Sequence, residues 1–117
     1  MTARWLRLEN LAVAVLAGVL FFQTGTSLWW LLAWIAPDLA MVGYLANPRL
    51  GARLYNAAHT YAAPVGLGAV GLAMSFPLAT ALALLWANHI GVDRTLGHGL
   101  KETTGFHDTH LGRIGRG

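Results

Sequence analysis

The sequence predicts an all-α, polytopic membrane protein: a bundle of four transmembrane helices with both termini in the cytoplasm. Three observations carry this prediction. Of the 117 residues, 56% are hydrophobic, only 11% are charged, and the mean hydropathy is +0.51. A soluble domain carries about 25% charged residues, so this chain has too few charges to cover a water-facing surface. The absence of cysteine excludes disulfides and thiolate metal sites.

Four apolar stretches define the transmembrane domain, residues 1–94. The second stretch opens with Trp29 and Trp30, which are typical anchors at a membrane interface. In the third stretch, Ala62 and Gly66 have the spacing that permits close approach between helices. Counted from Leu6, the first stretch is long enough to cross the hydrocarbon core of a bilayer. The predicted spans are residues 6–23, 28–46, 54–74 and 78–93.

The positions of the basic residues predict the orientation of these helices. The loops at residues 23–27 and 75–77 carry no charge, whereas all eight Lys and Arg residues fall on the other side of a four-span topology. By the positive-inside rule, both termini and the middle loop are cytoplasmic. This placement explains the pI of about 10 without a nucleic-acid partner and indicates membrane lipids as partners instead. The eight residues are Arg4, Arg7, Arg49, Arg53, Arg94, Lys101, Arg113 and Arg116.

Ionisable residues inside the apolar spans indicate a functional site, because they are costly to place there. His89 and Asp93 are four residues apart, which puts both on one face of a helix. Asp38 is a lone carboxylate in the second span, and His59 lies at a similar depth in the third. Such a carboxylate must find a partner across the bundle or become protonated, and His59, His89 and Arg53 are the available partners. We expect one polar site that opens to the cytoplasm.

Three interpretations of this site are open. In the leading one, the four residues are catalytic groups that bind a divalent metal (Zn, Mn or Fe), which activates water. In the second, Asp38 and a histidine form a proton-transfer pair for acid–base chemistry or proton coupling. In the third they only satisfy one another and hold the helices in register. The four residues are Asp38, His59, His89 and Asp93, and the side chains expected to support them are Tyr55, Asn56, Trp86 and Asn88.

The tail, residues 95–117, is polar and rich in Gly and His. In one interpretation it folds back over the cytoplasmic mouth of the site and supplies further ligands. In the other it is a solvated segment whose histidines have no role. Lys101 and Arg113 have a separate predicted role, which is to bind lipid phosphates at the inner leaflet. The candidate ligands in the tail are His98, His107, Asp108 and His110.

Nearly the whole chain takes part in a family resemblance, which is carried by four strings: Ala36–Met41, Tyr55–Tyr61, His89–Arg94 and Asp108–Arg113. In these strings the chain resembles a family of small bacterial membrane proteins that is catalogued as a domain of unknown function. The resemblance implies four transmembrane helices and a bacterial inner membrane, without an established activity. A looser similarity, in the clustered His and Asp residues alone, is to bacterial membrane-bound metal-dependent hydrolases. Their motif strings do not match here, so no catalytic residue carries over.

Functions from three different classes are consistent with these features. The leading hypothesis is a membrane-embedded hydrolase or isomerase of a lipophilic substrate. The second is a proton-coupled transporter in which Asp38 titrates. It requires a homo-oligomer, because a single copy of four short helices encloses little pore. The third is a non-catalytic subunit or scaffold of a larger membrane complex, with a histidine that ligates a haem or a chlorophyll-type pigment.

Overall fold

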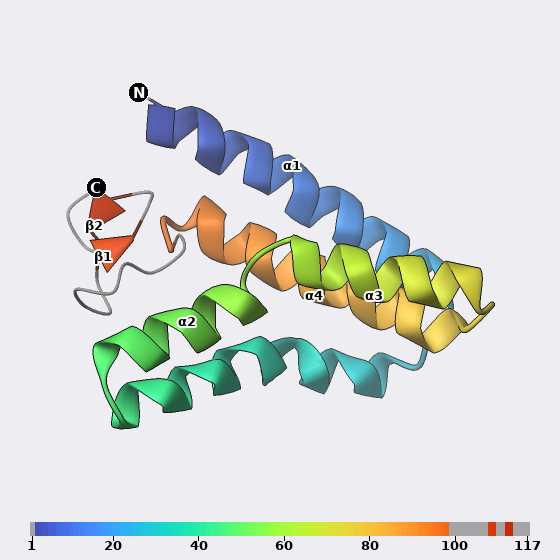
Figure 1. Ribbon diagram of the computed structural model, residues 1–117. Helices are drawn as coiled ribbons and strands as arrows, with labels where there is room; N and C mark the ends of the chain where they lie inside the picture. Colours follow the sequence, from blue (N-terminus) through green and yellow to red (C-terminus); the bar gives the residue numbers. More distant parts are fainter. Residues whose placement is uncertain (1, 99–107, 110–111, 114–117) are drawn as a thin grey trace.

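Helices make up nearly all of the part of the chain that the computed structural model describes, residues 2–98, 108–109 and 112–113 (Figure 1). The predicted all-α class is confirmed. A single antiparallel pairing, of β1 (Asp108–Thr109) with β2 (Gly112–Arg113), adds to the helices in the described part of the tail. The helices are α1 (Thr2–Gln23), the 3₁₀ helix η1 (Leu28–Leu45), α2 (Pro48–Ala58), α3 (Ala62–Ala73) and α4 (Pro77–Thr95).

Local sequence signals explain where these helices begin and end. The side chain of Asn47 accepts a hydrogen bond from the backbone N–H of Leu50 (2.8 Å), and Pro48 follows at the first position of α2. Pro77 begins α4 in the same way. Gly25 has a φ of +70°, a backbone conformation that favours glycine, and it turns the chain after α1.

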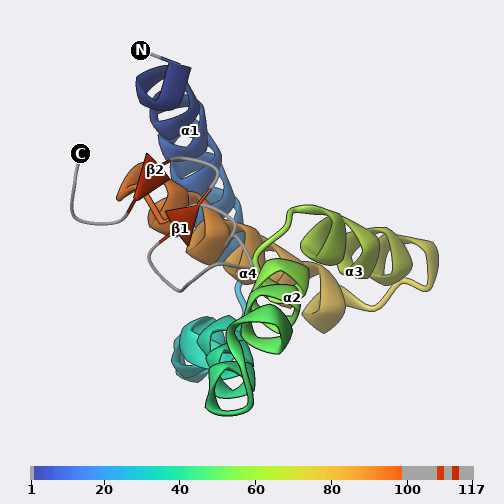
Figure 2. The ribbon, with the colours of Figure 1, turned by 60° about the vertical axis from the view of Figure 1, so that its left-hand side comes forward.

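α4 lies at the centre of the arrangement. It packs against α1 and α3 and contacts η1, while α2 packs along η1 (Figures 1 and 2). The start of α1, the turn between η1 and α2, and the end of α4 all lie at one end of the molecule in Figure 1, and the other two loops lie at the opposite end. A hydrogen bond from Arg7 Nε to the carbonyl oxygen of Thr95 (2.7 Å) joins the first and last helices at the first end.

The predicted third span, residues 54–74, is not one helix. The chain leaves the helical path after Ala58 and resumes it at Ala62, so the region is divided between α2 and α3. Pro64 gives the physical reason. It has no N–H to donate to the carbonyl of Thr60, and its ring would clash with that carbonyl inside a continuous helix, whereas the first turn of a new helix tolerates it. The break places His59 at a helix end.

Close helix approach occurs at a different glycine from the one that the sequence predicts. A Cβ atom added to Gly66 would meet no atom within 4 Å, so the prediction for Gly66 is wrong. A Cβ atom added to Gly91 would lie 2.9 Å from both the backbone nitrogen of Ala14 and the carbonyl oxygen of Asn10. α1 and α4 therefore touch backbone to backbone at Gly91, and only glycine fits there without a shift.

The interior is small and the exterior is apolar. Phe21, Ala81 and Leu85 form a buried cluster where α1 and α4 meet. Among the described helices, α1 and η1 are long and apolar enough to cross a membrane, by length and composition. Only 22% and 11% of their most apolar 18-residue windows are buried, whereas the core helix of a soluble protein would be mostly buried. This exposure suggests association with a membrane.

Candidate metal centre

Four ionisable side chains from three elements meet in the interior, and we call them the His/Asp cluster: Asp38 from η1, His59 just after α2, and His89 and Asp93 from α4. One ligand atom from each lies within 4.8 Å of the others. Both histidines are buried, while the side chain of Asp38 is 36% exposed and that of Asp93 is 15% exposed. The structure therefore brings together the four residues predicted to share one site, and the cluster could hold a metal ion.

Each histidine nitrogen of the cluster is nearly equidistant from the other histidine and from both carboxylates. His59 Nε2 lies 3.1 Å from Asp38 Oδ1, 3.1 Å from His89 Nε2 and 3.3 Å from Asp93 Oδ2. His89 Nε2 lies 3.2 Å from the same oxygen of each carboxylate. Ligands of a tetrahedral ion with bonds of ~2.0–2.1 Å are ~3.3–3.4 Å apart, and neighbouring ligands of an octahedral ion with bonds of ~2.1 Å are ~3.0 Å apart. The observed spacing fits the ligand shell of one ion.

Hydrogen bonding alone satisfies this arrangement poorly. Nδ1 of His59 lies 2.9 Å from the carbonyl oxygen of Tyr55, and only a protonated ring nitrogen can make that contact. In the neutral ring, Nε2 of His59 then carries a lone pair that points at the other three residues. If both histidines were fully protonated, two N–H groups would face each other across 3.1 Å. A cation would satisfy the four ligand atoms that face one another, and imidazole and carboxylate suit Zn, Mn or Fe.

The break between α2 and α3 holds His59 at the cluster. Carbonyl groups in the last turn of a helix lack partners within the helix, and in an apolar setting each needs another donor. Trp86 Nε1 donates to the carbonyl oxygen of Ala58 (2.6 Å), and Arg94 Nη2 donates to that of His59 (3.2 Å). Nδ1 of His59 itself donates to Tyr55. Two side chains of α4 therefore anchor the backbone on which His59 is carried.

The predicted supporting residues take different parts. The ring of Tyr55 is stacked on that of His59, with centroids 3.7 Å apart and planes at 7°. The carbonyl oxygen of Asn56 accepts a hydrogen bond from the backbone N–H of His59 (3.2 Å), so the contact is through its main chain. Asn88 is a bridge between helices, as described next. The contact of Trp86 with Ala58 completes the support of His59.

Asn88 connects three helices beside the cluster. Its Nδ2 donates to the carbonyl oxygen of Ala14 on α1 (2.7 Å), and its Oδ1 accepts from Trp34 Nε1 on η1 (2.9 Å). The ring of Trp34 in turn lies 4.3 Å from that of His89. From the sequence, Trp34 is expected to be a contact with lipid or with the membrane interface. It instead lies against Asn88 and His89, and its position four residues before Asp38 was a usable signal.

A second network was also not predicted. The guanidinium of Arg94 lies 4.8 Å from the centre of the Tyr61 ring, and the Tyr61 hydroxyl donates to Asn10 Oδ1. Asn10 is buried and its Nδ2 donates to the carbonyl oxygen of Leu6 (2.6 Å). These contacts join the helix break to α1. The signal in the sequence was two polar residues, Asn10 and Tyr61, within apolar stretches. Their positions in the sequence do not show which groups they bind.

Other predicted site residues lie elsewhere. Arg53 is exposed, and the ion pairs of Asp38 in the described part of the chain are with His59 and His89. His98 lies just beyond α4, where its backbone N–H donates to the carbonyl of Asp93 (2.7 Å), and its side chain is not in the cluster. Of the remaining candidates in the tail, Asp108 and Arg113 are paired through the backbone of β1 and β2. Lys101, His107 and His110 lie outside the described residues.

Fold and site together define a small, apolar helical protein with a buried His/Asp cluster that could hold a metal ion. The chain belongs to the family described as Domain of unknown function (DUF4260), whose model matches residues 3–114. This confirms the predicted family of unknown function. No curated protein and no solved structure matches the chain.

Proposed function

We propose that the protein is a multi-pass membrane protein of a bacterial inner membrane, with α1, η1, the α2–α3 pair and α4 as four membrane segments. The exposed apolar surfaces of α1 and η1 support this topology. The broken third segment is compatible with lipid because side chains satisfy its free carbonyls. Arg7, Arg49 and Arg94 belong to segments at one end of the molecule, which is the cytoplasmic end by the positive-inside rule.

The second part of the proposal is that the His/Asp cluster binds one divalent ion, Zn, Mn or Fe. The convergence of four ligand atoms within 4.8 Å, from three elements, is the observation that carries it. Catalytic zinc sites have three protein ligands and one open position. His59, His89 and Asp93 are the less exposed side chains and are assigned as the three ligands. Asp38 is the most exposed of the four and is assigned to the open position.

The third part is an activity, the hydrolysis of an amphipathic substrate. A divalent ion supplies Lewis-acid activation of water or of a carbonyl or phosphoryl group. Asp38 is the carboxylate best placed to accept a proton from the attacking water, because it is the more exposed of the two. The water oxygen bonds to the carbonyl or phosphoryl centre, the bond to the leaving oxygen breaks, and the proton passes to that oxygen.

Metal content of the purified protein, measured by mass spectrometry, tests the site. We expect about one ion per chain in the wild type and loss of that ion in His59→Ala and His89→Ala. His98→Ala is the matched control, since it removes a histidine outside the cluster. Unchanged metal content in both cluster variants would overturn the metal site.

Isotope incorporation tests the reaction. The protein is incubated in ¹⁸O-labelled water with a lipid extract of the membrane from which it is purified. Hydrolysis places one ¹⁸O atom in the products, and we expect this label with the wild type but not with His59→Ala. Asp38→Asn distinguishes the two carboxylates: it should keep most of the metal and lose the activity, whereas Asp93→Asn should lose both. Equal labelling with wild type and His59→Ala would refute the hydrolase.

A further inference from the structure

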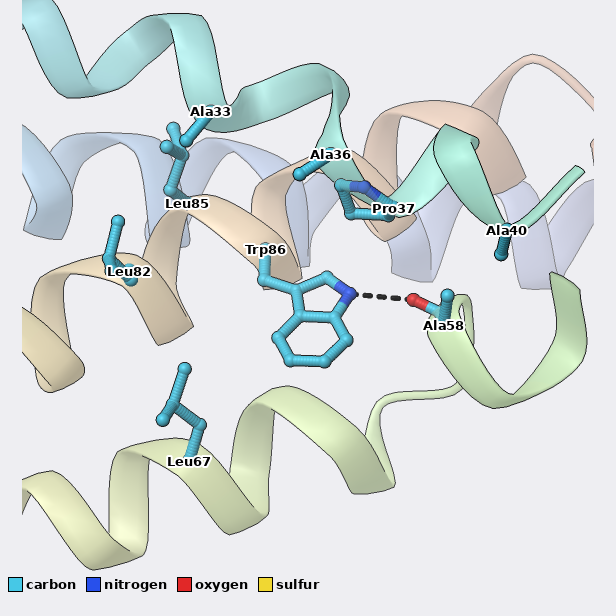
Figure 3. Close-up of a pocket in the computed structure, with 9 residues that line it drawn as sticks. All are labelled: Ala33, Ala36, Pro37, Ala40, Ala58, Leu67, Leu82, Leu85 and Trp86. Carbon is cyan, nitrogen blue, oxygen red and sulfur yellow. Dashed lines mark hydrogen bonds between the residues drawn. The ribbon is translucent and has the colours of Figure 1, made fainter. Parts of the chain in front are cut away.

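An apolar pocket of about 330 Å³ lies beside the His/Asp cluster, between η1, α3 and α4 (Figure 3). Ala36 and Pro37 of η1 line one side, Leu67 of α3 the other, and Leu85 of α4 part of the wall between them. The indole of Trp86 lies across the pocket, with its N–H directed at the carbonyl of Ala58. That hydrogen bond uses the indole donor, and the other side chains of the lining are hydrocarbon.

The lining of the pocket adjoins the cluster in the sequence on three elements. Pro37 immediately precedes Asp38, and Ala58 immediately precedes His59. On α4, Leu85 and Trp86 lie one turn before His89, on the same face of the helix. A molecule with a hydrocarbon part in the pocket would therefore present its other end to the two histidines and the two carboxylates.

We propose that this pocket binds one acyl chain of a membrane lipid, whose polar head is the substrate group at the His/Asp cluster. This inference rests on the proposed function and specifies its substrate class. A methylene group takes about the space of a water molecule, ~30 Å³, so the pocket holds about eleven methylenes of a single chain.

A second apolar pocket provides an internal comparison. It has a volume of about 400 Å³ and lies between α3 and α4, where Val65, Ala69 and Leu72 line it. None of its lining residues is next to a cluster residue in the chain. The two pockets are similar in volume and in the apolar character of their linings. They differ in that the lining of the first pocket adjoins the cluster residues in the sequence.

Photolabelling with single-chain phosphatidylcholines tests the assignment in lipid nanodiscs. One probe carries a diazirine near the head group and the other near the end of the chain, and mass spectrometry maps the labelled residues. We expect the first probe to label Ala58 and the indole of Trp86 that is bonded to it, and the second to label Ala33 and Leu82. In Figure 3, Ala58 lies at one end of the pocket and Ala33 and Leu82 lie at the other, with Trp86 between them. The reverse order, or labels mainly on Val65 and Leu72, would overturn the proposal.

Two variants isolate the pocket from the metal site. Ala36→Phe occupies part of the pocket, and Ala69→Phe occupies part of the comparison pocket. Displacing two methylenes costs about fourfold in affinity for each, so Ala36→Phe should reduce labelling of Trp86 by about fifteenfold while Ala69→Phe leaves it unchanged. Equal labelling in all three proteins would refute the chain site. Metal content is measured in the same samples, so a protein that binds the chain without metal would contradict the proposed function alone.

Discussion

Replacing Trp86 by Phe tests whether α4 anchors the helix break. Phe keeps an aromatic ring in the apolar pocket but removes the N–H that donates to the carbonyl of Ala58. A hydrogen bond contributes about 0.5–1.5 kcal/mol, and a carbonyl left without a partner costs about 1–3 kcal/mol. Interhelical hydrogen bonds in membranes average about 0.6 and reach about 1.7 kcal/mol. We therefore expect Trp86→Phe to lower the free energy of unfolding by about 1–2 kcal/mol.

Thermal unfolding in detergent measures this loss, which corresponds to roughly 3–10 °C in Tm for a chain of this size. Trp29→Phe is the matched control, because the side chain of Trp29 is 81% exposed. The same variant should weaken metal binding, since Ala58 adjoins His59, and loss of a group that orients a ligand typically costs about tenfold or more in affinity. Metal titration monitored by calorimetry gives that affinity.

Two results would refute this reasoning. If Trp86→Phe and Trp29→Phe have the same Tm, the hydrogen bond to Ala58 does not stabilise the break. If Trp86→Phe is less stable but binds metal as tightly as the wild type, the anchor supports the fold without orienting His59. Only the combination of lower stability and weaker metal binding supports the coupling inferred from the structure.

Three further predictions concern the metal and the helix contacts. Chelation of a bound ion should lower the Tm by about 10 °C, since an ion at 100 times its Kd stabilises the protein by about 2.7 kcal/mol. Differential scanning fluorimetry measures this shift, and a chelator should leave the Tm of His59→Ala unchanged. Gly91→Ala should lower the Tm by several degrees, because the added Cβ meets the backbone of α1. Gly66→Ala is the control and should be neutral or stabilising by up to about 1 kcal/mol. Equal Tm values for the two variants would contradict the backbone contact at Gly91. Asn88→Leu removes two interhelical hydrogen bonds and should cost about 1–3 kcal/mol in a denaturation titration, and an unchanged midpoint would show that Trp34 finds another acceptor.

The grouping of the four cluster residues was predictable because it depends on helix period and depth. His89 and Asp93 are one turn apart, and that spacing gives the 3.2 Å contact between their side chains. Asp38 had no charge nearby in sequence and therefore required a partner from another span. Neither argument depends on the helix type of η1, so both hold although η1 is a 3₁₀ helix.

The helix break was not predictable from hydropathy, because Ala62 to Ala73 is as apolar as an uninterrupted span. Pro64 carried the signal, but proline also occurs inside membrane helices where neighbours satisfy the free carbonyl. A break leaves more carbonyls free than a kink does, and these need donors from other helices. Here the donors are Trp86 and Arg94, whose targets lie 28 and 35 residues away in the chain. No local pattern contains that information.

The break also explains why a metal ion suits this position. The carbonyl groups at the end of α2 carry the negative end of the helix dipole, and His59 is the residue at which α2 ends. A cation at the cluster therefore lies near this negative end as well as between two carboxylates. A continuous helix through residues 54–74 would have satisfied its own carbonyls and given up that contribution. In this respect the division of the third span is part of the site, and Pro64, which enforces it, acts on the cluster without touching it.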